Sequence, residues 1–447
     1  MIEDRAVELH RKYGGKIQVI PKVPIKSFED FSIWYTPGVA SPCRLISLDK
    51  DLSFELTSRW NMVAVVSDGS RVLGLGNIGP YAGYPVIEGK CLLFKFLGGV
   101  DAVPIALATQ DADKIIEMVR LISPSFGGIN LEDIESPKCF QILETLQKSL
   151  EIPVWHDDQQ GTSLVVLAAL INALKIVGKK LEEAKITIIG SGAAGMATAR
   201  LLMETGVSGR NMLIVDSKGI LSSSRHDMEK LSILNPWKAE LARMTNPENK
   251  EGSIEDALKG SDVLIALSVP KPGTVKKEWI SKMAGDPIVF ALANPLPEIW
   301  PEDAKAGGAR IVATGRSDFP NQVNNSLAFP SMFRGVLTVR SRAITNELCI
   351  EGARSLARYA ESKGLSENSI LPTMDDYMAY VEVARNVARK AIELNLARRK
   401  YSDNELYDAI HSIIAYQRVL MRNMIKSGLT GEYQPNTSCM ATDEQPE

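Results

Sequence analysis

The chain has 447 residues, of which 45% are apolar and 23% charged, and its net charge is −3. This length allows two or three domains with large cores. The near-neutral charge argues against a nucleic-acid partner and against a long acidic tail. The five scattered cysteines form no C-x-x-C pair, which argues against a disulfide framework or a structural zinc site and favours a reducing cytoplasm.

No segment has the pattern of a membrane span or of a signal peptide. The N-terminus, MIEDRAVELHRKYGG, lacks the apolar core of a signal peptide. The longest apolar stretch, residues 163–177, is interrupted by Asn172 and Lys175 and is too short for a membrane span. It predicts a buried helix, and the sequence indicates no membrane partner.

Residues 1–160 predict a mixed α/β domain. Short β-rich runs, MVAVVSDGS, CLLFKFLGG and DAVPIAL, alternate with loops rich in glycine and proline. Residues 111–122 and 137–150 show the apolar spacing of helices. No flexible linker separates this region from the next, so we expect a packed joint.

Residues 161–335 predict a doubly wound parallel sheet of Rossmann type. The runs KITIIG, NMLIVD, DVLIAL, IVFALAN and RIVATG are short and apolar, as expected of strands buried on both faces. Residues 336–430 predict a helical C-terminal region, and residues 431–447 a polar, disordered tail. The expected fold class is therefore α/β with an added helical region.

The pattern G-x-G-x-x-G occurs twice, and the second copy fits a dinucleotide-binding loop. Gly190, Gly192 and Gly195 follow a strand and open a helix, whose N-terminus offers free N–H groups to a pyrophosphate. Asp216 follows about 20 residues after Gly195, where such folds place a ribose-binding carboxylate. The predicted cofactor-binding residues are Gly190, Gly192, Ala193, Ala194, Gly195 and Asp216.

The first copy, Gly74, Gly76 and Gly79, fails the same test. Pro80 follows Gly79 directly, and an interior proline costs about 3 kcal/mol in a helix, so no helix is expected to open there. This copy predicts a tight loop where backbone passes close to another group.

Asp216 favours NAD over NADP, because a carboxylate binds ribose hydroxyls and repels a 2′-phosphate. Lys218 stands two residues further on and could neutralise such a phosphate. NAD is therefore the expected cofactor, with NADP left open.

Two pairs of adjacent acids stand in loops, Glu132–Asp133 and Asp157–Asp158. Carboxylates that converge from two loops repel one another unless a cation holds them, and oxygen ligands suit Mg²⁺ or Mn²⁺. For either pair alone, solvated loop acids are the better interpretation. His156 adjoins the second pair, but without further nitrogen or sulfur ligands it predicts a hydrogen-bonded structural histidine rather than zinc.

Two further residues are candidates for proton transfer. Tyr35 precedes a Pro-Gly turn in WYTPGVA, where its phenol could face a cleft or pack half-buried. Lys90 in EGKCLLF stands before an apolar run interpreted as a strand. Burial there would lower its pKa toward that of a general base, whereas exposure would make it an ordinary surface lysine.

Together these motifs resemble malic enzyme in its short bacterial and archaeal form. The matching stretches, in the family's order, are WYTPGVA, SDGSRVLGLGNIGP, EGKCLLFKFLGGVDAVPI, INLEDIESPKCF, IPVWHDDQQGTS, IIGSGAAGMA, ALANPLPEI and ATGRSDFPNQVNNSLAFPSMFRG. They cover roughly residues 31–335. Ser191 and Gln160 replace an alanine and a histidine that are common in the family, and neither change removes a group the mechanism needs.

The resemblance implies oxidative decarboxylation of L-malate to pyruvate and CO₂, with NAD(P) and a divalent metal. Its implied metal ligands are Glu132, Asp133 and Asp158, with Asp157 beside them. It implies Lys90 as the general base and Tyr35 as the acid that protonates C3. Arg71 would pair with a malate carboxylate, while Asn294 and Asn325 would hydrogen-bond substrate or nicotinamide. Homodimers or larger homo-oligomers are expected.

Three other functions remain open. A malolactic enzyme would produce lactate with tightly held NAD, and the sequence alone does not distinguish it. A metal-independent amino-acid dehydrogenase would not need the ordered acidic motifs. A nucleotide-sensing protein without turnover would not need Tyr35, Lys90 and the carboxylates together.

Overall fold

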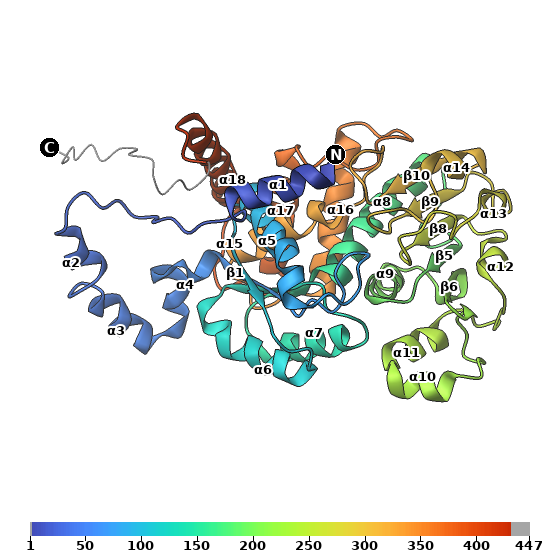
Figure 1. The fold of residues 1–447 in the computed structure, drawn as a ribbon, viewed down its shortest axis with the longest axis horizontal. Helices are drawn as coiled ribbons and strands as arrows, with labels where there is room; N and C mark the ends of the chain where they lie inside the picture. Colours follow the sequence, from blue (N-terminus) through green and yellow to red (C-terminus); the bar gives the residue numbers. More distant parts are fainter. Residues whose placement is uncertain (1, 431–447) are drawn as a thin grey trace.

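The structure is a computed structural model that describes residues 2–430. The polar tail expected from residue 431 lies outside the described residues. Two parallel sheets form the centres of two α/β layers, and the C-terminal helices pack between and beside them (Figure 1). The expected α/β class with a Rossmann-type sheet is confirmed.

The first sheet has four parallel strands in the order β2-β1-β3-β4. Their bounds are β1 Met62–Ser67, β2 Asp101–Ala106, β3 Gly128–Leu131 and β4 Val154–His156. Nearly every residue of β1, β3 and β4 is buried, because helices cover the sheet. These helices are α5 (Gly79–Gly98), α6 (Ala112–Ile122) and α7 (Lys138–Ser149).

The prediction of a strand at residues 91–99 is wrong. Residues 91–99 do not form a strand but end helix α5. Ile87, Cys91, Phe94 and Leu97 are buried at helical spacing. Since α5 is apolar on several faces, its helical period is hidden within a continuous apolar run, which reads equally well as a buried strand.

The expectation that no helix opens at Gly79 is also wrong. Helix α5 begins there, with Pro80 in its first turn. A proline is tolerated at this place because the first N–H groups of a helix have no intrahelical partner. Pro85 lies inside the helix, and the carbonyl of Pro85 accepts a hydrogen bond from Lys16 Nζ at 2.9 Å.

The second sheet has six strands in the order β10-β9-β8-β5-β6-β7, parallel except for the last pair. Its strands are β5 Ile186–Ile189, β6 Met212–Asp216, β7 Gly219–Ile220, β8 Val263–Ala266, β9 Ile288–Ala291 and β10 Ile311–Thr314. The surrounding helices are α9 Ala193–Glu204, α10 Met228–Leu234, α11 Pro236–Met244, α12 Ile254–Leu258, α13 Lys277–Ile280 and α14 Pro301–Ala306. All five strands expected from residue 185 onward are confirmed.

Helix α8 (Thr162–Ile176) links the two layers and is the buried helix expected from residues 163–177. Together with the preceding turn it is long and apolar enough to cross a membrane, but most of it is buried inside the protein, as in the core helix of a globular fold. The helices that follow the second sheet are α15 Phe329–Thr338, α16 Asn346–Ser362, α17 Tyr377–Glu393 and α18 Asp403–Lys426.

Aromatic contacts join the C-terminal helices to the first layer. The ring of Phe94 on α5 lies 4.6 Å from Phe329 and 5.1 Å from Phe333 on α15. These edge contacts bury a shared apolar seam. The region after residue 335 is therefore part of the fold that supports α5.

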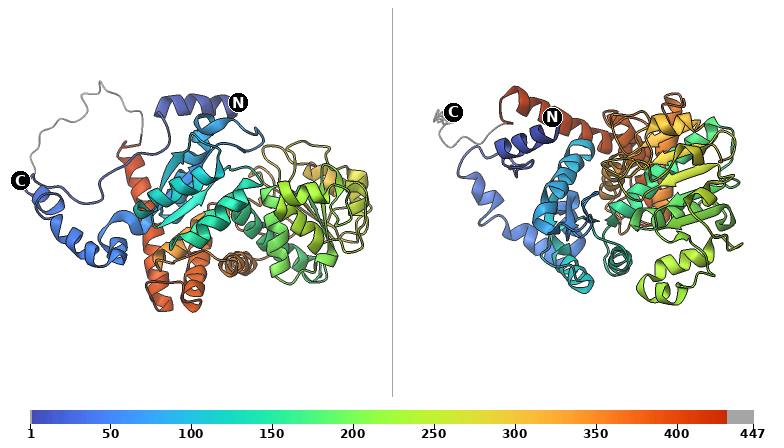
Figure 2. Two further views of the ribbon diagram at one scale, coloured as in Figure 1. Left: turned by 90° about the horizontal axis from the view of Figure 1, so that it is seen from below. Right: turned by 45° about the vertical axis from the view of Figure 1, so that its right-hand side comes forward.

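The N-terminal segment behaves differently. Helix α1 (Ile2–Tyr13) lies along the body, whereas α2 (Asp30–Trp34) and α3 (Ala40–Leu48) project from it, on the side away from the six-stranded sheet (Figures 1 and 2). The chain returns through α4 (Ser53–Leu56) into β1. Short helical turns complete the fold: η1 Lys50–Leu52, η2 Ser58–Asn61, η3 Ser123–Ser125, η4 Asp157–Gly161, η5 Gly209–Asn211 and η6 Asn325–Leu327.

Candidate active site

The two acidic pairs meet at one edge of the four-stranded sheet. Strands β3 and β4 are parallel neighbours, so Glu132–Asp133 after β3 and Asp157–Asp158 after β4 leave the sheet side by side. One carboxylate oxygen each of Glu132, Asp133 and Asp158 lies within 4.8 Å of the others. The structure thus brings together the three ligands that the resemblance implied.

Local backbone geometry allows adjacent acids to face one target. Asp133 has a φ of 56°, a left-handed conformation that re-aims its side chain relative to Glu132. Its N–H donates to Asp158 Oδ2 at 3.0 Å. After β4 the chain makes a single wide turn that ends at Gly161, where an added Cβ would lie 2.1 Å from Asp157 Oδ1. A side chain at Gly161 would therefore displace Asp157.

Lys90 lies at the centre of this group. Its Nζ is 3.0 Å from Glu132 Oε1 and 2.6 Å from Asp157 Oδ2, and it lies 4.3 Å from the centre of the Phe329 ring. The side chain is buried, at 8% exposure. Lys90 is therefore not at the mouth of a strand, as the sequence suggested, but on the inner face of α5.

The expected lowering of the pKa of Lys90 is wrong for the chain without ligands. Burial alone would lower its pKa, but the negative charges of Asp157 and Glu132 outweigh burial and raise it. The lysine is thus held as a cation by two acids. It becomes neutral only when other positive charge satisfies those acids.

The carboxylates, in turn, are crowded. Burial and the neighbouring acids raise the pKa of Glu132 well above its ordinary value. Burial and Asp158 raise the pKa of Asp133 to about 8. Asp133 Oδ2 is buried and has no hydrogen-bond partner among the described residues. This surplus of buried negative charge with an unsatisfied oxygen fits a divalent cation with oxygen ligands.

Asp157 differs from the other three acids. It is fully buried, and Trp155 Nε1 donates to its Oδ1 at 2.9 Å while Lys90 occupies Oδ2. Both oxygens are thereby engaged. Asp157 holds Lys90 in place and stands outside the ligand set.

His156 does not match its expected role as a hydrogen-bonded residue. Its ring is fully buried, and neither ring nitrogen has a hydrogen-bond partner among the described residues. Burial lowers the pKa of His156, which keeps the ring neutral. Its Nδ1 lies 3.7 Å from Asp158 Oδ2, too far for a hydrogen bond. Its backbone N–H donates to Gln160 Oε1 at 3.0 Å, so Gln160 supports the turn that carries Asp158.

The first glycine loop connects the acids to the second layer. The N–H of Arg71 donates to the carbonyl of Asp133 at 3.0 Å, and the Arg71 side chain is exposed beside the cluster. At Gly74 an added Cβ would lie 3.0 Å from the carbonyl oxygen of Asn294. Pro270 Cγ, in the loop after β8, would lie even closer, at 2.6 Å. This glycine therefore permits the close approach that the sequence suggested, and the groups it approaches are the loops after β8 and β9.

Asn294 and Asn325, the two amide residues implied as contacts of substrate or nicotinamide, lie near the acids and the first glycine loop. An added Cβ at Gly315, after β10, would meet Asn294 Nδ2 at 2.6 Å, which places this amide between the loops that follow β9 and β10. Asn325 begins η6, and its Cβ would lie 3.2 Å from a Cβ at Gly161. Both amides therefore stand where the two layers meet.

The second glycine loop has the expected geometry. Gly190 follows β5 with a φ of 107°, and α9 begins at Ala193 without a side-chain cap. An added Cβ would lie 2.3 Å from the carbonyl of Leu267 at Gly190, and 1.9 Å from the carbonyl of Gly190 at Gly195. The uncapped N–H groups at the start of α9 remain available to an anion.

We expect Gly195→Ala and Gly192→Ala to differ in stability but not in cofactor binding. Gly195→Ala forces the loop open and lowers stability by about 1–3 kcal/mol. At Gly192 an added Cβ meets nothing within 4 Å, so the melting temperature stays unchanged. Both variants should bind NADH more weakly. The added methyl group of Gly192→Ala occupies the path of the pyrophosphate, and Gly195→Ala opens the loop that holds it. Calorimetry and NADH fluorescence titration measure the two effects. Unchanged NADH affinity in both would contradict the assignment of this loop.

Tyr35 is the one implied catalytic residue that the structure leaves far from the others. It ends α2 on the projecting segment and is 70% exposed. The views in Figures 1 and 2 place α2 on the far side of the first layer from the six-stranded sheet. Within a single chain, Tyr35 therefore does not face the carboxylate cluster.

Sequence reasoning missed two residues that shape the site, Asn130 and Glu298. Asn130 Nδ2 donates to Glu132 Oε2 at 2.9 Å and orients that ligand. Buried Glu298 accepts the N–H groups of Ser268 at 2.7 Å and Ala293 at 3.2 Å, tying the loops after β8 and β9 together. Asn130 stands two residues before Glu132, on the same side of the strand, and this alternation was the available signal.

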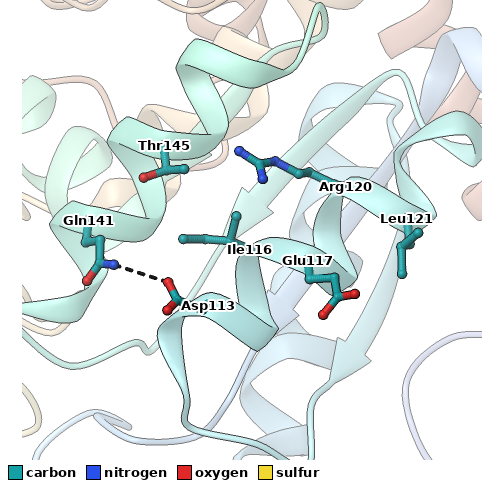
Figure 3. A pocket seen from close by; sticks show the side chains of 7 residues that line it. All are labelled: Asp113, Ile116, Glu117, Arg120, Leu121, Gln141 and Thr145. Atoms are coloured by element: carbon teal, nitrogen blue, oxygen red, sulfur yellow. Dashed lines mark hydrogen bonds between the residues drawn. The ribbon is translucent and has the colours of Figure 1, made fainter.

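A surface pocket of about 450 Å³ lies elsewhere, between α6 and α7 (Figure 3). Its lining includes Asp113, Glu117 and Arg120, and Gln141 donates to Asp113 at 3.4 Å. Neither the carboxylate cluster nor the glycine loops line it. It does not bear on the chemistry of the site.

Two family profiles match the chain. The profile described as the malic enzyme N-terminal domain matches residues 14–112 and 108–147, and that described as the malic enzyme NAD binding domain matches residues 159–392. Together they cover most of the described chain, including every residue of the cluster except Asp157 and Asp158, which lie at their junction.

Individual relatives agree. A bifunctional malic/malolactic enzyme of Bacillus subtilis is 47% identical over 89% of this chain and 95% of its own length. An NAD-dependent malic enzyme of Geobacillus stearothermophilus is 48% identical over 89% of this chain and 80% of its own length. The crystal structure of malic enzyme from Pyrococcus horikoshii superposes with a TM-score of 0.91 at 50% identity, covering 96% of this chain and 99% of that one. The chain therefore belongs to the malic enzyme family.

Proposed function

We propose that this protein oxidises L-malate and decarboxylates the product to pyruvate and CO₂, with NAD as its preferred hydride acceptor and Mg²⁺ or Mn²⁺ as its metal. One observation carries the proposal: Glu132, Asp133 and Asp158 converge on one point while Lys90 lies buried between Glu132 and Asp157. The family relationship supports the reaction and an NAD(P) cofactor.

Glu132, Asp133 and Asp158 would hold the metal, and the loop from Gly190 to Gly195 would hold the pyrophosphate. When bound, the metal supplies positive charge at the C2 oxygen and the nicotinamide accepts the C2 hydride. Lys90 Nζ takes the proton of the C2 hydroxyl, and Arg71 and Asn294 orient the substrate. Tyr35 gives its phenolic proton to C3 of the enolate that remains after CO₂ leaves.

The test is an absorbance assay at 340 nm with malate, NAD or NADP, and Mn²⁺, with and without a chelator. We expect reduction of the nucleotide that requires both malate and metal, with pyruvate formed in equal amount. Undiminished turnover in the presence of chelator would contradict the metal site, while turnover of an amino acid in place of malate would contradict the substrate.

The preference for NAD rests on the surroundings of Asp216 at the end of β6. Burial would raise the pKa of Asp216, but hydrogen bonds from Lys238, the backbone of Lys218, and Arg225 outweigh burial and lower it. Its Oδ2 lies 2.9 Å from Arg225 Nη1, and within residues 2–430 its Oδ1 accepts only the Lys218 N–H, at 2.8 Å. Oδ1 therefore keeps a free lone pair for a ribose hydroxyl.

Cofactor preference should respond to single charge changes at this place. Asp216→Asn leaves three cations, Lys218, Arg225 and Lys238, beside the ribose with one acid fewer. We expect the ratio of kcat/KM for NADP to that for NAD to rise at least about tenfold, since such a charge pair is worth 1.4 kcal/mol or more. Lys238→Met should move the ratio the other way. An unchanged ratio of kcat/KM in both variants would contradict the role of Asp216.

A second reaction, conversion of malate to lactate, is favoured by the similarity to the Bacillus subtilis enzyme, whose name includes malolactic activity. It would use the same malate and nicotinamide contacts, followed by return of the hydride to pyruvate. Lactate formed without net change at 340 nm would show it. Pyruvate as the sole product would restrict the chain to the oxidative reaction.

We further propose a cytoplasmic homo-oligomer. Cys43, Cys91, Cys139 and Cys349 are all free thiols, which fits a reducing compartment. The exposed apolar side chains of the projecting N-terminal segment, among them Phe28 at 91% and Ile33 at 63% exposure, support an oligomer.

A further inference from the structure

Glu298 carries a buried charge in the cofactor-binding layer that the proposed reaction steps do not use. It stands in the loop after β9, and its side chain is fully buried. Its Oε1 accepts the N–H of Ser268 at 2.7 Å and the hydroxyl of Ser268 at 3.1 Å, and its Oε2 accepts the N–H of Ala293 at 3.2 Å. In the part of the chain that the structure describes, all of its hydrogen-bond donors are neutral groups. Glu298 is thus a buried carboxylate without a cation beside it.

The hydrogen bonds indicate that Glu298 is ionised. An ionised carboxylate only accepts hydrogen bonds, and each donor around Glu298 points at one of its two oxygens. Burial raises the pKa of Glu298, while the backbone and hydroxyl donors oppose that rise. A buried anion without a cation is unfavourable, because it loses hydration and gains only dipoles in return. A cation that arrives with a ligand would offset this cost.

The fold places this carboxylate at the edge where a dinucleotide would bind. The sheet order β10-β9-β8-β5-β6-β7 consists of two halves, β5–β7 and β8–β10, on either side of a crevice. The first half carries the Gly190–Gly195 loop for the pyrophosphate, so the second half would receive the nicotinamide end of the cofactor. Ser268 and Ala293 each stand two residues beyond the end of their strand. Glu298 therefore lies at the carboxyl edge of the second half.

The loop that contains Glu298 also contains Asn294, which is implied to contact nicotinamide or substrate. The N–H that donates to Glu298 Oε2 belongs to the residue directly before Asn294. In the loop after β10, Arg316 donates to the carbonyl of Pro295 at 2.7 Å, but its own charge is paired with Asp318 at 2.6 Å. The cation that contacts this loop is therefore already neutralised, and the charge of Glu298 stays uncompensated.

We propose that Glu298 is the counter-charge of the oxidised nicotinamide ring and gives this chain a preference for NAD⁺ over NADH. The ring carries a positive charge when it is oxidised and none after it has accepted a hydride. A fixed negative charge nearby stabilises the first form more than the second, so it favours binding of NAD⁺ and release of NADH. This inference rests on the proposed function only for the use of a nicotinamide cofactor.

Two binding measurements test the proposal, made on the full chain with a chelator present and without malate. Fluorescence titration gives the Kd of NADH, and displacement of NADH by NAD⁺ gives the Kd of NAD⁺. Glu298→Gln keeps the shape of the side chain and removes its charge. We expect the ratio of the Kd for NADH to the Kd for NAD⁺ to fall about tenfold, which corresponds to about 1.4 kcal/mol. An unchanged ratio would overturn the proposal.

A second variant separates the charge from the geometry of the loops. Glu298→Asp keeps the charge but shortens the side chain by one methylene group, so the bonds to Ser268 and Ala293 weaken and both loops loosen. The two affinities should fall together, and their ratio should stay within about twofold of the wild type, because the Coulomb interaction changes little over about 1 Å. A ratio about tenfold lower in Glu298→Asp would overturn the proposal, also where Glu298→Gln does not fold.

Glu302→Gln is the matched control. It makes the same change four residues along the chain, at an exposed acid in the first turn of α14, where water and salt screen the charge. Its ratio should equal that of the wild type, and a fall as large as in Glu298→Gln would overturn the specific role of Glu298. A wild-type chain that binds neither NADH nor NAD⁺ would contradict the proposed function as well. Binding with an unchanged ratio in Glu298→Gln would contradict only the role of Glu298.

Discussion

Lys90→Ala lowers malate oxidation by about 10²–10⁴-fold, the range that a positioned general base contributes. The lysine is the one amine within reach of both Glu132 and Asp157 among the described residues, and its replacement leaves no group to take the C2 hydroxyl proton. The measurement is kcat with saturating malate, NAD and Mn²⁺. Binding of NADH should be nearly unchanged, because the Gly190–Gly195 loop belongs to the other layer.

A structural explanation must be separated from a catalytic one, since removal of Lys90 leaves two buried acids without their cation, at a cost of about 3–5 kcal/mol. Added primary amines should restore part of the turnover of Lys90→Ala if the missing group is a base. Lys95→Ala is the matched control, because Lys95 lies on the same helix and pairs with Asp101 at 2.6 Å, away from the cluster. Near-normal turnover of Lys90→Ala, or no response to amines, would contradict Lys90 as the base.

The Rossmann-type layer could be predicted because its signals are local. Each strand is a short apolar run, and the loop from Gly190 to Gly195 carries steric requirements that the structure shows at two of its glycines. Helix α5 could not be predicted in the same way. Its apolar faces pack against the sheet, α15 and α18, so burial on several sides removes the alternation that reveals a helix.

The carboxylate cluster was predictable for a geometric reason. Acids that follow neighbouring parallel strands leave the sheet at the same edge, so Glu132 and Asp158 converge once β3 and β4 pair. The protonation of Lys90 was not predictable, because it depends on which acids surround it in the folded chain. The position of Tyr35 was not predictable either, since its motif does not reveal that α2 projects from the body of the chain.

Asp158→Asn should have opposite effects on stability and activity. In the chain without metal, Asp158 adds negative charge that raises the pKa of both Glu132 and Asp133. Removing that charge should raise the melting temperature measured in chelator. The amide oxygen can still accept the N–H of Asp133, so the turn is kept. Malate oxidation should fall at least about 10²-fold, because a lost ligand weakens a contribution worth several kcal/mol.

Metal-dependent stabilisation tests whether the carboxylate cluster binds a divalent cation. A cation that binds only the folded chain stabilises it by about 2.7 kcal/mol at a concentration 100 times its Kd, so Mn²⁺ should raise the melting temperature of the wild type. Asp158→Asn should lose most of this rise. Glu135→Gln should keep it, because Glu135 stands three residues from Glu132 but faces Lys138 at 3.5 Å. If Asp158→Asn both gained stability in chelator and kept the full response to Mn²⁺, the acids would repel one another without serving a metal. Their crowding would then have no cation to offset it, and the mechanism built on Glu132, Asp133 and Asp158 would fail.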